Sequence, residues 1–202
     1  MSLDALAPLR LPPDLRLSPE QLELVCAENR DAVHELAADG HVVALTPTGS
    51  ETGSCNGELF FQLKLYAKCS GEWKAFDRST GFWLPDGSVV SPDAFLIRLE
   101  RWQALSPEER RSFAHLCADL VVALASPPDD GPRGLTTLRQ NMSVYRHNCA
   151  RLGWLRIPHS QAVACRVVSC PSTAVPRQRE QLDVLKATPE FPGLQLAGIW
   201  AG

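Results

Sequence analysis

The apolar residues of this chain recur with two different spacings. Between residues 135 and 152 the steps alternate between three and four, which is the spacing of one face of a helix. This pattern predicts a helix over residues 135–151, and a similar spacing between Leu59 and Tyr66 predicts a helix over residues 52–69. The apolar positions of the first stripe are Leu135, Leu138, Met142, Tyr145, Cys149 and Leu152.

Short apolar runs bounded by turn residues predict strands. The run from Leu120 to Ala125 lies between Asp119 and Ser126-Pro127, and its length favours a strand buried on both faces. Further strands are predicted over residues 153–157, 162–168 and 182–186, with a loop over residues 171–180. The tail from Phe191 to Trp200 is expected to pack back through its apolar residues.

Turn and capping residues set the boundaries of the remaining elements. A hairpin is predicted over residues 33–45 with its turn at Asp39-Gly40, and a central hairpin over residues 76–98 with its turn at residues 85–88. Two capping boxes predict helix starts: Ser18 begins a helix that ends near residue 29, and Ser106 begins one that ends near residue 116. The order predicts the α+β class, an α/β sandwich in which a mixed sheet is flanked by helices on both sides.

Length and composition describe an ordinary globular protein. We expect residues 1–16 to form a flexible N-terminal tail and residues 17–202 to form a single domain. The formal net charge of −3 argues against a protein that coats nucleic acid, but it leaves room for a local basic cleft. No run approaches 18 apolar residues and the N-terminus lacks the features of a signal peptide, so we expect no membrane span and a cytoplasmic protein. The seven cysteines include no Cys-x-x-Cys pair, which favours reduced thiols over zinc.

Two acids have positions that call for an explanation. Asp93 follows Ser91-Pro92 and leads directly into the apolar run Ala94–Ile97. A carboxylate at the mouth of a buried strand needs a hydrogen-bond donor, a cation or a metal. Glu35 lies in the first arm of the first hairpin, where it is either a solvated residue or part of a site, and the strand alone favours the solvated face.

A series of segments between about Ser18 and Trp200 resembles one family. The chain is similar to the Uma-two family of restriction endonucleases, a branch of the PD-(D/E)XK nuclease superfamily. The segments that carry the resemblance occur in the family's order and are residues 47–53, 76–82, 84–87, 91–93, 101–108, 120–122, 126–127, 150–155 and 191–194.

The resemblance implies metal-assisted hydrolysis of DNA. It implies Mg²⁺ or Mn²⁺ as the cofactor, DNA as a candidate partner, a restriction-endonuclease-like fold and a homodimer. The family's acids fall on Asp93, Glu35 and Ala123, and its lysine falls on Asn141. Two of these four chemical positions are therefore replaced, because Ala123 stands for Glu and Asn141 for Lys.

Neighbouring residues offer little compensation for these replacements. Asp119 lies four residues from Ala123, which is about 13 Å along an extended strand and too far. Arg139 is about 200° around the helix from Asn141 and remains protonated, so it cannot act as a base. Asp129 and Asp130 lie in a loop that could fold back towards the site.

Three functions remain open at this point. The first is a pseudonuclease that keeps the scaffold, with Asp93 and Glu35 as weak metal ligands. The second is an active metal-dependent endonuclease with a rearranged site. The third is a non-enzymatic interaction protein in which Asp93 is only a hydrogen-bonded turn acid.

Overall fold

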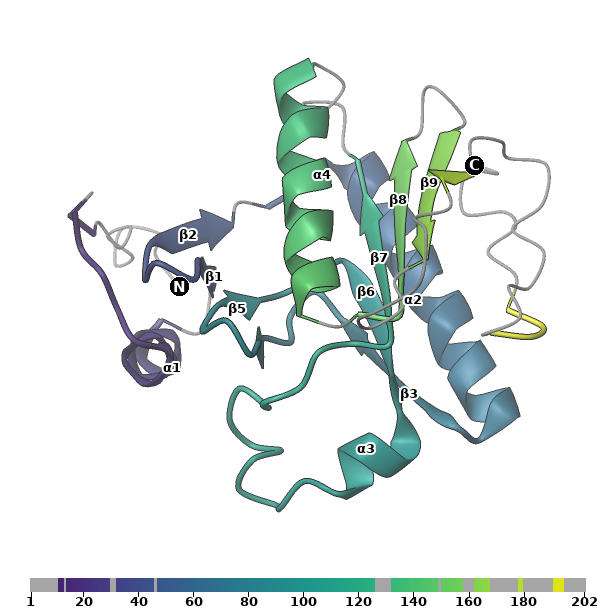
Figure 1. Cartoon of the computed structure of the whole chain (residues 1–202), viewed down its shortest axis with the longest axis horizontal. Coiled ribbons are helices and arrows are strands. Elements are labelled where there is room, and N and C mark those ends of the chain that lie inside the picture. Colours follow the sequence, from purple (N-terminus) through teal and green to yellow (C-terminus); the bar gives the residue numbers. More distant parts are fainter. Residues whose placement is uncertain are drawn as a thin grey trace, which may run out of the picture.

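The computed structural model describes residues 11–12, 14–29, 32–45, 47–125, 132–148, 150–157, 162–167, 178–179 and 191–194. Its helices and strands form two sheets with helices around them (Figure 1). The α+β prediction is therefore confirmed. No helix in these ranges combines the length and the apolar character that crossing a membrane requires.

The larger sheet has the strand order β10-β9-β8-β7-β6-β3. Strands β7 and β8 pair in parallel, and the other neighbours pair antiparallel, so the sheet is mixed. The strands are β3 (Trp73–Asp77), β6 (Ala94–Arg98), β7 (Leu120–Leu124), β8 (Leu152–Ile157), β9 (Ala162–Val167) and β10 (Gln178–Arg179).

Two helices cover the opposite faces of this sheet. Helix α2 (Ser50–Ser70) packs its buried residues on one face, and helix α4 (Pro132–His147) packs on the other (Figure 1). Successive side chains of a strand point to opposite faces of the sheet, so each strand contributes to both cores. In β7, Leu120, Val122 and Leu124 belong to the core under α2, whereas Val121 and Ala123 face the core under α4.

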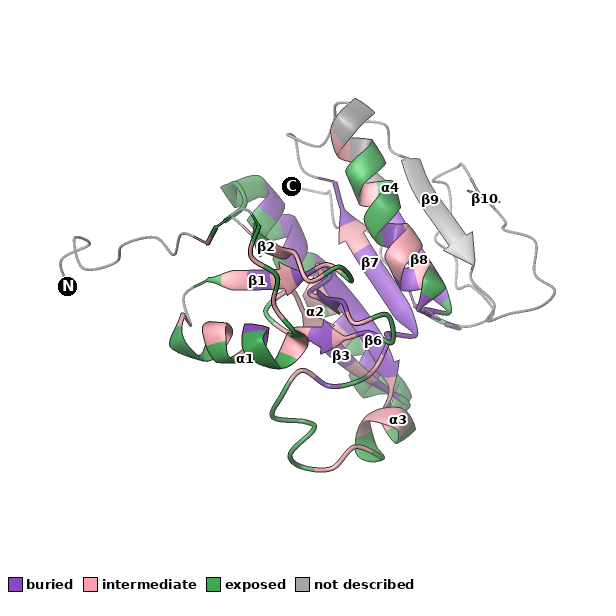
Figure 2. Cartoon of the chain, turned by 60° about the vertical axis from the view of Figure 1, so that its left-hand side comes forward, coloured by how far each residue is buried: buried purple, intermediate pink, exposed green. Residues whose placement is uncertain are grey.

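The smaller sheet is antiparallel, with the order β2-β1-β5-β4. Its strands are β1 (Val33–Leu36), β2 (Val42–Leu45), β4 (Phe82–Trp83) and β5 (Val89–Val90). Helix α1 (Pro19–Glu28) lies beside β1 and contributes Leu22 to a small core with Leu36 and Val89 (Figure 2). Within the predicted tail, Arg16 forms a β-bridge with His41.

Most of the predicted elements are present. The capping box of Ser18 begins α1, the hairpin turning at residues 39–40 forms β1 and β2, and the stripe of apolar residues forms α4. The central hairpin is divided between the sheets, because β4 and β5 pair in the smaller sheet while β3 and β6 pair in the larger one. Phe191 and Leu194 are buried in the core under α2, as expected for the start of the C-terminal tail.

Three predictions need comment. The helix predicted over residues 106–116 is wrong, because the segment forms turns although its capping box is made between Ser106 and Glu109. Instead of a helical bond, the Trp83 N–H donates to the Ala114 carbonyl at 3.1 Å, so pairing with β4 competes successfully with helix growth. The short helix α3 (Leu99–Gln103) was not predicted, and β10 lies in the predicted loop 171–180. The strand predicted over residues 182–186 lies outside the described residues.

Candidate functional site

Strand alternation sets the direction of Glu35. Its neighbours His34 and Leu36 are both buried on the opposite face of β1, so Glu35 points away from the small core. There its carboxylate accepts a hydrogen bond from the Ser91 N–H at 2.6 Å. This bond joins the first hairpin to the segment that leads into β6, across residues that are far apart in the sequence.

Asp93 lies two residues after Ser91 and directly before β6. Its Oδ2 atom accepts a hydrogen bond from the Leu124 N–H at 2.8 Å. A hydrogen-bond donor on β7 is therefore one partner of this acid. The bond also places Asp93 beside the end of the strand that carries Ala123.

The carboxylates of Glu35 and Asp93 interact electrostatically. Burial raises the pKa of Glu35 above its usual range, and the charge of Asp93 raises it further. The Ser91 N–H and the charge of Arg78 act in the opposite direction and do not cancel the rise. Two carboxylates that share a poorly solvated region resist double ionisation.

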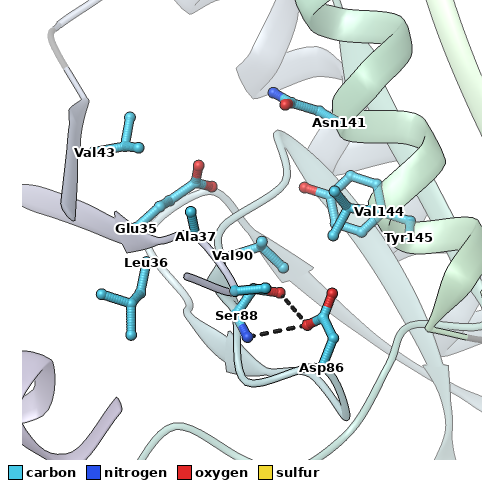
Figure 3. Close-up of a pocket in the computed structure, with 11 residues that line it drawn as sticks. Glu35, Leu36, Ala37, Val43, Asp86, Ser88, Val90, Asn141, Val144 and Tyr145 are labelled. Atoms are coloured by element: carbon cyan, nitrogen blue, oxygen red, sulfur yellow. Dashed lines mark hydrogen bonds between the residues drawn. The ribbon is translucent and has the colours of Figure 1, made fainter. Parts of the chain in front are cut away.

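A pocket of about 150 Å³ lies between the smaller sheet and α4. Figure 3 shows the carboxylate of Glu35, the amide of Asn141 and the hydroxyl of Tyr145 pointing into the space between them. Two of the four family positions, Glu35 and Asn141, therefore line one pocket. The lining residues are Glu35, Leu36, Ala37, Ala38, Val43, Asp86, Ser88, Val90, Asn141, Val144 and Tyr145.

Ala123 faces the same side of the large sheet as the pocket wall formed by α4. Its half-buried methyl group packs against the core that contains Met142 and Tyr145. A methyl group has no lone pair for a metal and no proton to transfer. Ala123 is not among the residues that line the pocket, and its side chain offers no ligand atom.

Asn141 occupies an exposed position on α4 and lines the pocket. Its amide is neutral and does not titrate, so it supplies neither the charge nor the proton chemistry of a lysine. Arg139 is exposed on the same helix and is not among the residues lining the pocket, as its angle around the helix predicts.

Asp119, one of the acids that could replace the missing carboxylate, is engaged elsewhere. Asp119 is buried, and its Oδ2 atom accepts bonds from the Arg98 N–H at 2.9 Å and from Arg101 at 2.8 Å. It is thus held by an ion pair at the start of β7. Asp129 and Asp130 lie outside the described residues.

Tyr145 is a pocket residue that sequence reasoning missed. It is almost fully buried, and burial raises the pKa of its phenol well above the usual range, with further contributions from the charges of Glu35 and Asp93. The phenol therefore remains a neutral hydrogen-bond donor at any ordinary pH. Its sequence signal was its place one helical turn after Asn141, but a tyrosine in an apolar stripe is also typical of a core residue.

The turn of the central hairpin is fixed to the end of α4. Asp86 donates its N–H to Asn148 Oδ1 at 3.0 Å, and Asn148 Nδ2 donates to Asp86 Oδ2 at 2.8 Å. The other oxygen of Asp86 accepts bonds from the N–H and the hydroxyl of Ser88. Burial opposes ionisation of Asp86, but the bonds from Ser88 and Asn148 outweigh it and hold its pKa below the usual range.

Among the described residues, the acids near the pocket are too few to form a catalytic metal centre by themselves. Magnesium prefers oxygen ligands in octahedral geometry and is usually held by one or two carboxylates with substrate phosphates. Glu35 and Asp93 supply two carboxylates, but the described residues contain no group of three or more His, Cys, Asp or Glu side chains that could hold a metal ion. Each of the two acids accepts a backbone hydrogen bond and keeps further lone pairs, so the described residues fit part of a cation site.

Comparison with known proteins identifies the scaffold. No curated protein matches the chain. One solved structure, a putative nuclease belonging to DUF820 from Anabaena variabilis, superposes with a TM-score of 0.62 and 16% sequence identity, covering 87% of this chain and 90% of that chain. At this identity the likeness shows the fold alone, which is restriction-endonuclease-like. The family model described as "Uma2: Putative restriction endonuclease" matches residues 19–198. Because this match spans most of the sequence, the chain belongs to the Uma2 family, the Uma-two family that its motifs resemble.

Proposed function

We propose that this chain is a catalytically impaired nuclease that keeps the Uma2 scaffold and has lost half of its chemical groups. The observation that carries the proposal is the environment of Ala123. Its methyl group packs in the core under α4 at the position where the family resemblance places an acid. Family membership supports a nuclease-like ancestry and DNA as the ligand, and the two replacements argue against efficient hydrolysis.

A divalent cation, Mg²⁺ or Mn²⁺, is expected to bind weakly if it binds at all. Uma2 proteins are typically metal-dependent, and the proposed ligands here are Glu35 and Asp93. Carboxylates must be ionised to coordinate a cation, and the raised pKa of Glu35 makes its ionisation more costly. Without an acid at position 123, the cation would lack a side-chain ligand from β7.

Restoring the missing groups tests the proposal directly. We expect the wild-type protein to leave plasmid and linear DNA intact with Mg²⁺ or Mn²⁺, and the double variant Ala123→Glu, Asn141→Lys to cut them. A matched control, Ala123→Gln, Asn141→Met, adds side chains of similar size without the charges and should remain inactive. Adding Asp93→Ala to the active double variant should abolish its cutting.

Two other results would contradict the proposal. Cutting by the wild type that disappears in Asp93→Ala would show an active enzyme with a rearranged site, and the pair Asp129→Asn, Asp130→Asn would then locate the substituting acid. If the double variant neither cuts DNA nor binds Mn²⁺ in calorimetry, the site has lost more than two groups. That outcome favours an interaction protein. The cytoplasmic location of the chain stays a prediction.

A further inference from the structure

The hydroxyl of Tyr145 is a polar group on a buried side chain that is aimed into the pocket between the smaller sheet and α4. Tyr145 is 7% exposed, and its hydroxyl points into the open space of the pocket (Figure 3). Within the part of the chain that the structure describes, the hydrogen bonds of this residue involve only its main chain, whose carbonyl accepts from the Cys117 thiol and the Ala150 N–H. A hydroxyl away from bulk water needs a polar partner, so the pocket is suited to a ligand that hydrogen-bonds there.

The charges around the pocket are mainly negative. Its described lining residues include the carboxylates of Glu35 and Asp86 and no lysine, arginine or histidine. Asp93 lies close enough for its charge to raise the pKa values of both Glu35 and Tyr145. The charge of Arg78 also reaches Glu35, but Arg78 is not a lining residue. A field of this sign attracts cations and repels anions that no metal ion accompanies.

The hydrogen bonds of the two lining carboxylates limit the kind of cation. One oxygen of Glu35 accepts from the Ser91 N–H at 2.6 Å, which leaves its other oxygen available. Both oxygens of Asp86 are engaged, one by Ser88 and the other by Asn148. A guanidinium fork prefers two free oxygens of one carboxylate, whereas an ammonium group donates to single acceptors in different directions. The pocket therefore favours an ammonium group over a guanidinium group.

Three acceptors are available to an ammonium group in this space. The free oxygen of Glu35 comes from β1, and the Tyr145 hydroxyl and the Asn141 amide oxygen come from α4. Figure 3 shows these side chains directed into the same space. An ammonium group has three N–H donors and no acceptor, and a phenolic oxygen accepts as well as donates. Glu35 supplies the charge for binding, and Tyr145 supplies a hydrogen-bond acceptor.

The remaining wall of the pocket is apolar. Val43 is the register partner of Glu35 in the β1–β2 pair, so both side chains lie on one face of the smaller sheet. Val90 on β5 and Val144 on α4 continue this wall. A cavity of about 150 Å³ holds one benzene molecule, so a ligand of about six heavy atoms fills the pocket. Such a ligand combines the ammonium group with a short alkyl chain.

We propose that this pocket binds a primary alkylammonium ion with a chain of about four carbons. Its ammonium group pairs with the Glu35 carboxylate and donates to the Tyr145 hydroxyl, and its alkyl chain packs on Val43, Val90 and Val144. Free amines and lysine side chains both carry this chemical group. The inference goes beyond the nuclease proposal, because amine binding is measured without DNA or a divalent cation and either proposal can fail alone.

Titration of the isotope-labelled full chain with small ligands, followed by amide NMR shifts with chelator present, tests the proposal. n-Butylammonium should shift the amides of Val43, Ser91 and Val144 saturably, with a Kd in the millimolar range because so small a ligand makes few contacts. Butyrate and 1-butanol carry a similar chain without the positive charge and should bind about tenfold more weakly or not at all. n-Butylguanidinium should also bind more weakly, and equal binding would overturn the assignment to an ammonium group.

A blocked lysine separates the two sources of the ligand. Nα-acetyl-lysine methylamide carries the same four-carbon ammonium chain on a peptide backbone. Binding as tight as that of n-butylammonium would support the proposal with a lysine side chain as the ligand. Tighter binding of n-butylammonium would support it with a free amine.

Matched variants place the ligand in the pocket. Glu35→Gln keeps an acceptor for the Ser91 N–H but loses the charge, so it should weaken n-butylammonium binding about tenfold. Tyr145→Phe keeps the buried ring and should weaken binding about threefold, as expected for one hydrogen bond. Glu100→Gln is the control, because it removes an exposed carboxylate on α3 that does not line the pocket. Amide spectra show that each variant is folded. A wild type that does not bind n-butylammonium at tens of millimolar would overturn the proposal, as would equal binding of butyrate or an affinity that Glu35→Gln leaves unchanged.

Discussion

Asp93 accepts a hydrogen bond from the Leu124 N–H, at 2.8 Å from Oδ2 to the nitrogen. Leu124 follows Ala123 directly, so this acid is joined to the backbone of β7 beside the position where the family resemblance places an acid. The carboxylate therefore has a structural partner whether or not a cation is present.

Replacing Asp93 should consequently affect stability even without any metal. Asp93→Ala leaves the Leu124 N–H without this acceptor, and an unsatisfied buried donor costs about 1–3 kcal/mol. Asp93→Asn keeps an oxygen acceptor and should cost less than about 1 kcal/mol, since the net value of one hydrogen bond is about that size. Urea unfolding of the three proteins with chelator present measures both costs. Equal stability of Asp93→Ala and wild type would contradict a structural role.

The pH dependence of stability should reveal Glu35. Its ordinary pKa is near 4.5, and burial with the Asp93 charge raises it in the folded state. A raised pKa means that the folded protein holds this proton more tightly than the unfolded chain does. The associated stabilisation is therefore complete below pH 4.5 and is lost as pH rises through the folded-state value.

Glu35→Gln removes this dependence while keeping an acceptor for the Ser91 N–H. Compared with the wild type, the variant should lose relative stability at low pH and gain it towards neutral pH. Urea midpoints between pH 4 and 8 give the comparison. Parallel profiles for the two proteins would show that the pKa of Glu35 is the same in the folded and unfolded states.

The sequence predicts the helices and strands better than it predicts the arrangement of the candidate site. The stripe through Leu138, Met142 and Tyr145 predicts α4 because core contact and helix period give the same pattern. The proximity of Glu35 and Asp93 depends on pairing of Leu36 with Val89, which joins distant segments and leaves no local pattern. Only the family resemblance pointed to it.

The errors also arise from contacts between distant segments. At residues 106–116 the capping box forms, but the backbone beyond it pairs with Trp83, and no local rule announces that partner. The spacing of Tyr145 in the apolar stripe is that of a core residue, and Tyr145 is indeed buried. Its second property, a hydroxyl that faces the pocket, becomes visible only when β1 and α4 are brought together.

Two ion pairs of the large sheet, Arg101–Asp119 and Arg98–Glu72, should contribute very different amounts to the free energy of unfolding. Arg101→Ala leaves the buried carboxylate of Asp119 without its 2.8 Å partner, and removing one partner of a buried pair costs about 3–5 kcal/mol. We expect the lower end, because the Arg98 N–H still donates to Asp119 and Arg151 lies 3.9 Å away.

The pair between Arg98 and Glu72 is the internal control. Its atoms are also 2.8 Å apart, but the side chain of Glu72 is 62% exposed. Glu72→Ala should therefore cost less than about 1 kcal/mol, the usual limit for a surface pair. Thermal unfolding in low and high salt distinguishes the two pairs. A cost for Glu72→Ala as large as that for Arg101→Ala would refute the assignment based on burial.

Asn148 should be essential for holding the central hairpin against α4. Asn148→Ala removes both bonds to Asp86, and because Asp86 is exposed and water can replace them, each lost bond should cost about 0.5–1.5 kcal/mol. The depressed pKa of Asp86 contributes stability above its ordinary value of 3.8 that is lost as pH falls through the folded-state value. In Asn148→Ala this acid-induced loss should be smaller, because one of the donors that lowers the pKa is gone.

Asn148→Asp provides the opposite case. It keeps an acceptor for the Asp86 N–H but sets a second carboxylate against Asp86 Oδ2, where the amide donated at 2.8 Å. Repulsion between the two acids should make this variant less stable than Asn148→Ala at pH 7. On acidification one acid becomes protonated and can donate to the other, so Asn148→Asp should recover as the wild type weakens. Urea midpoints from pH 3 to 7 should therefore converge, and profiles that stay parallel would show that these side chains do not interact.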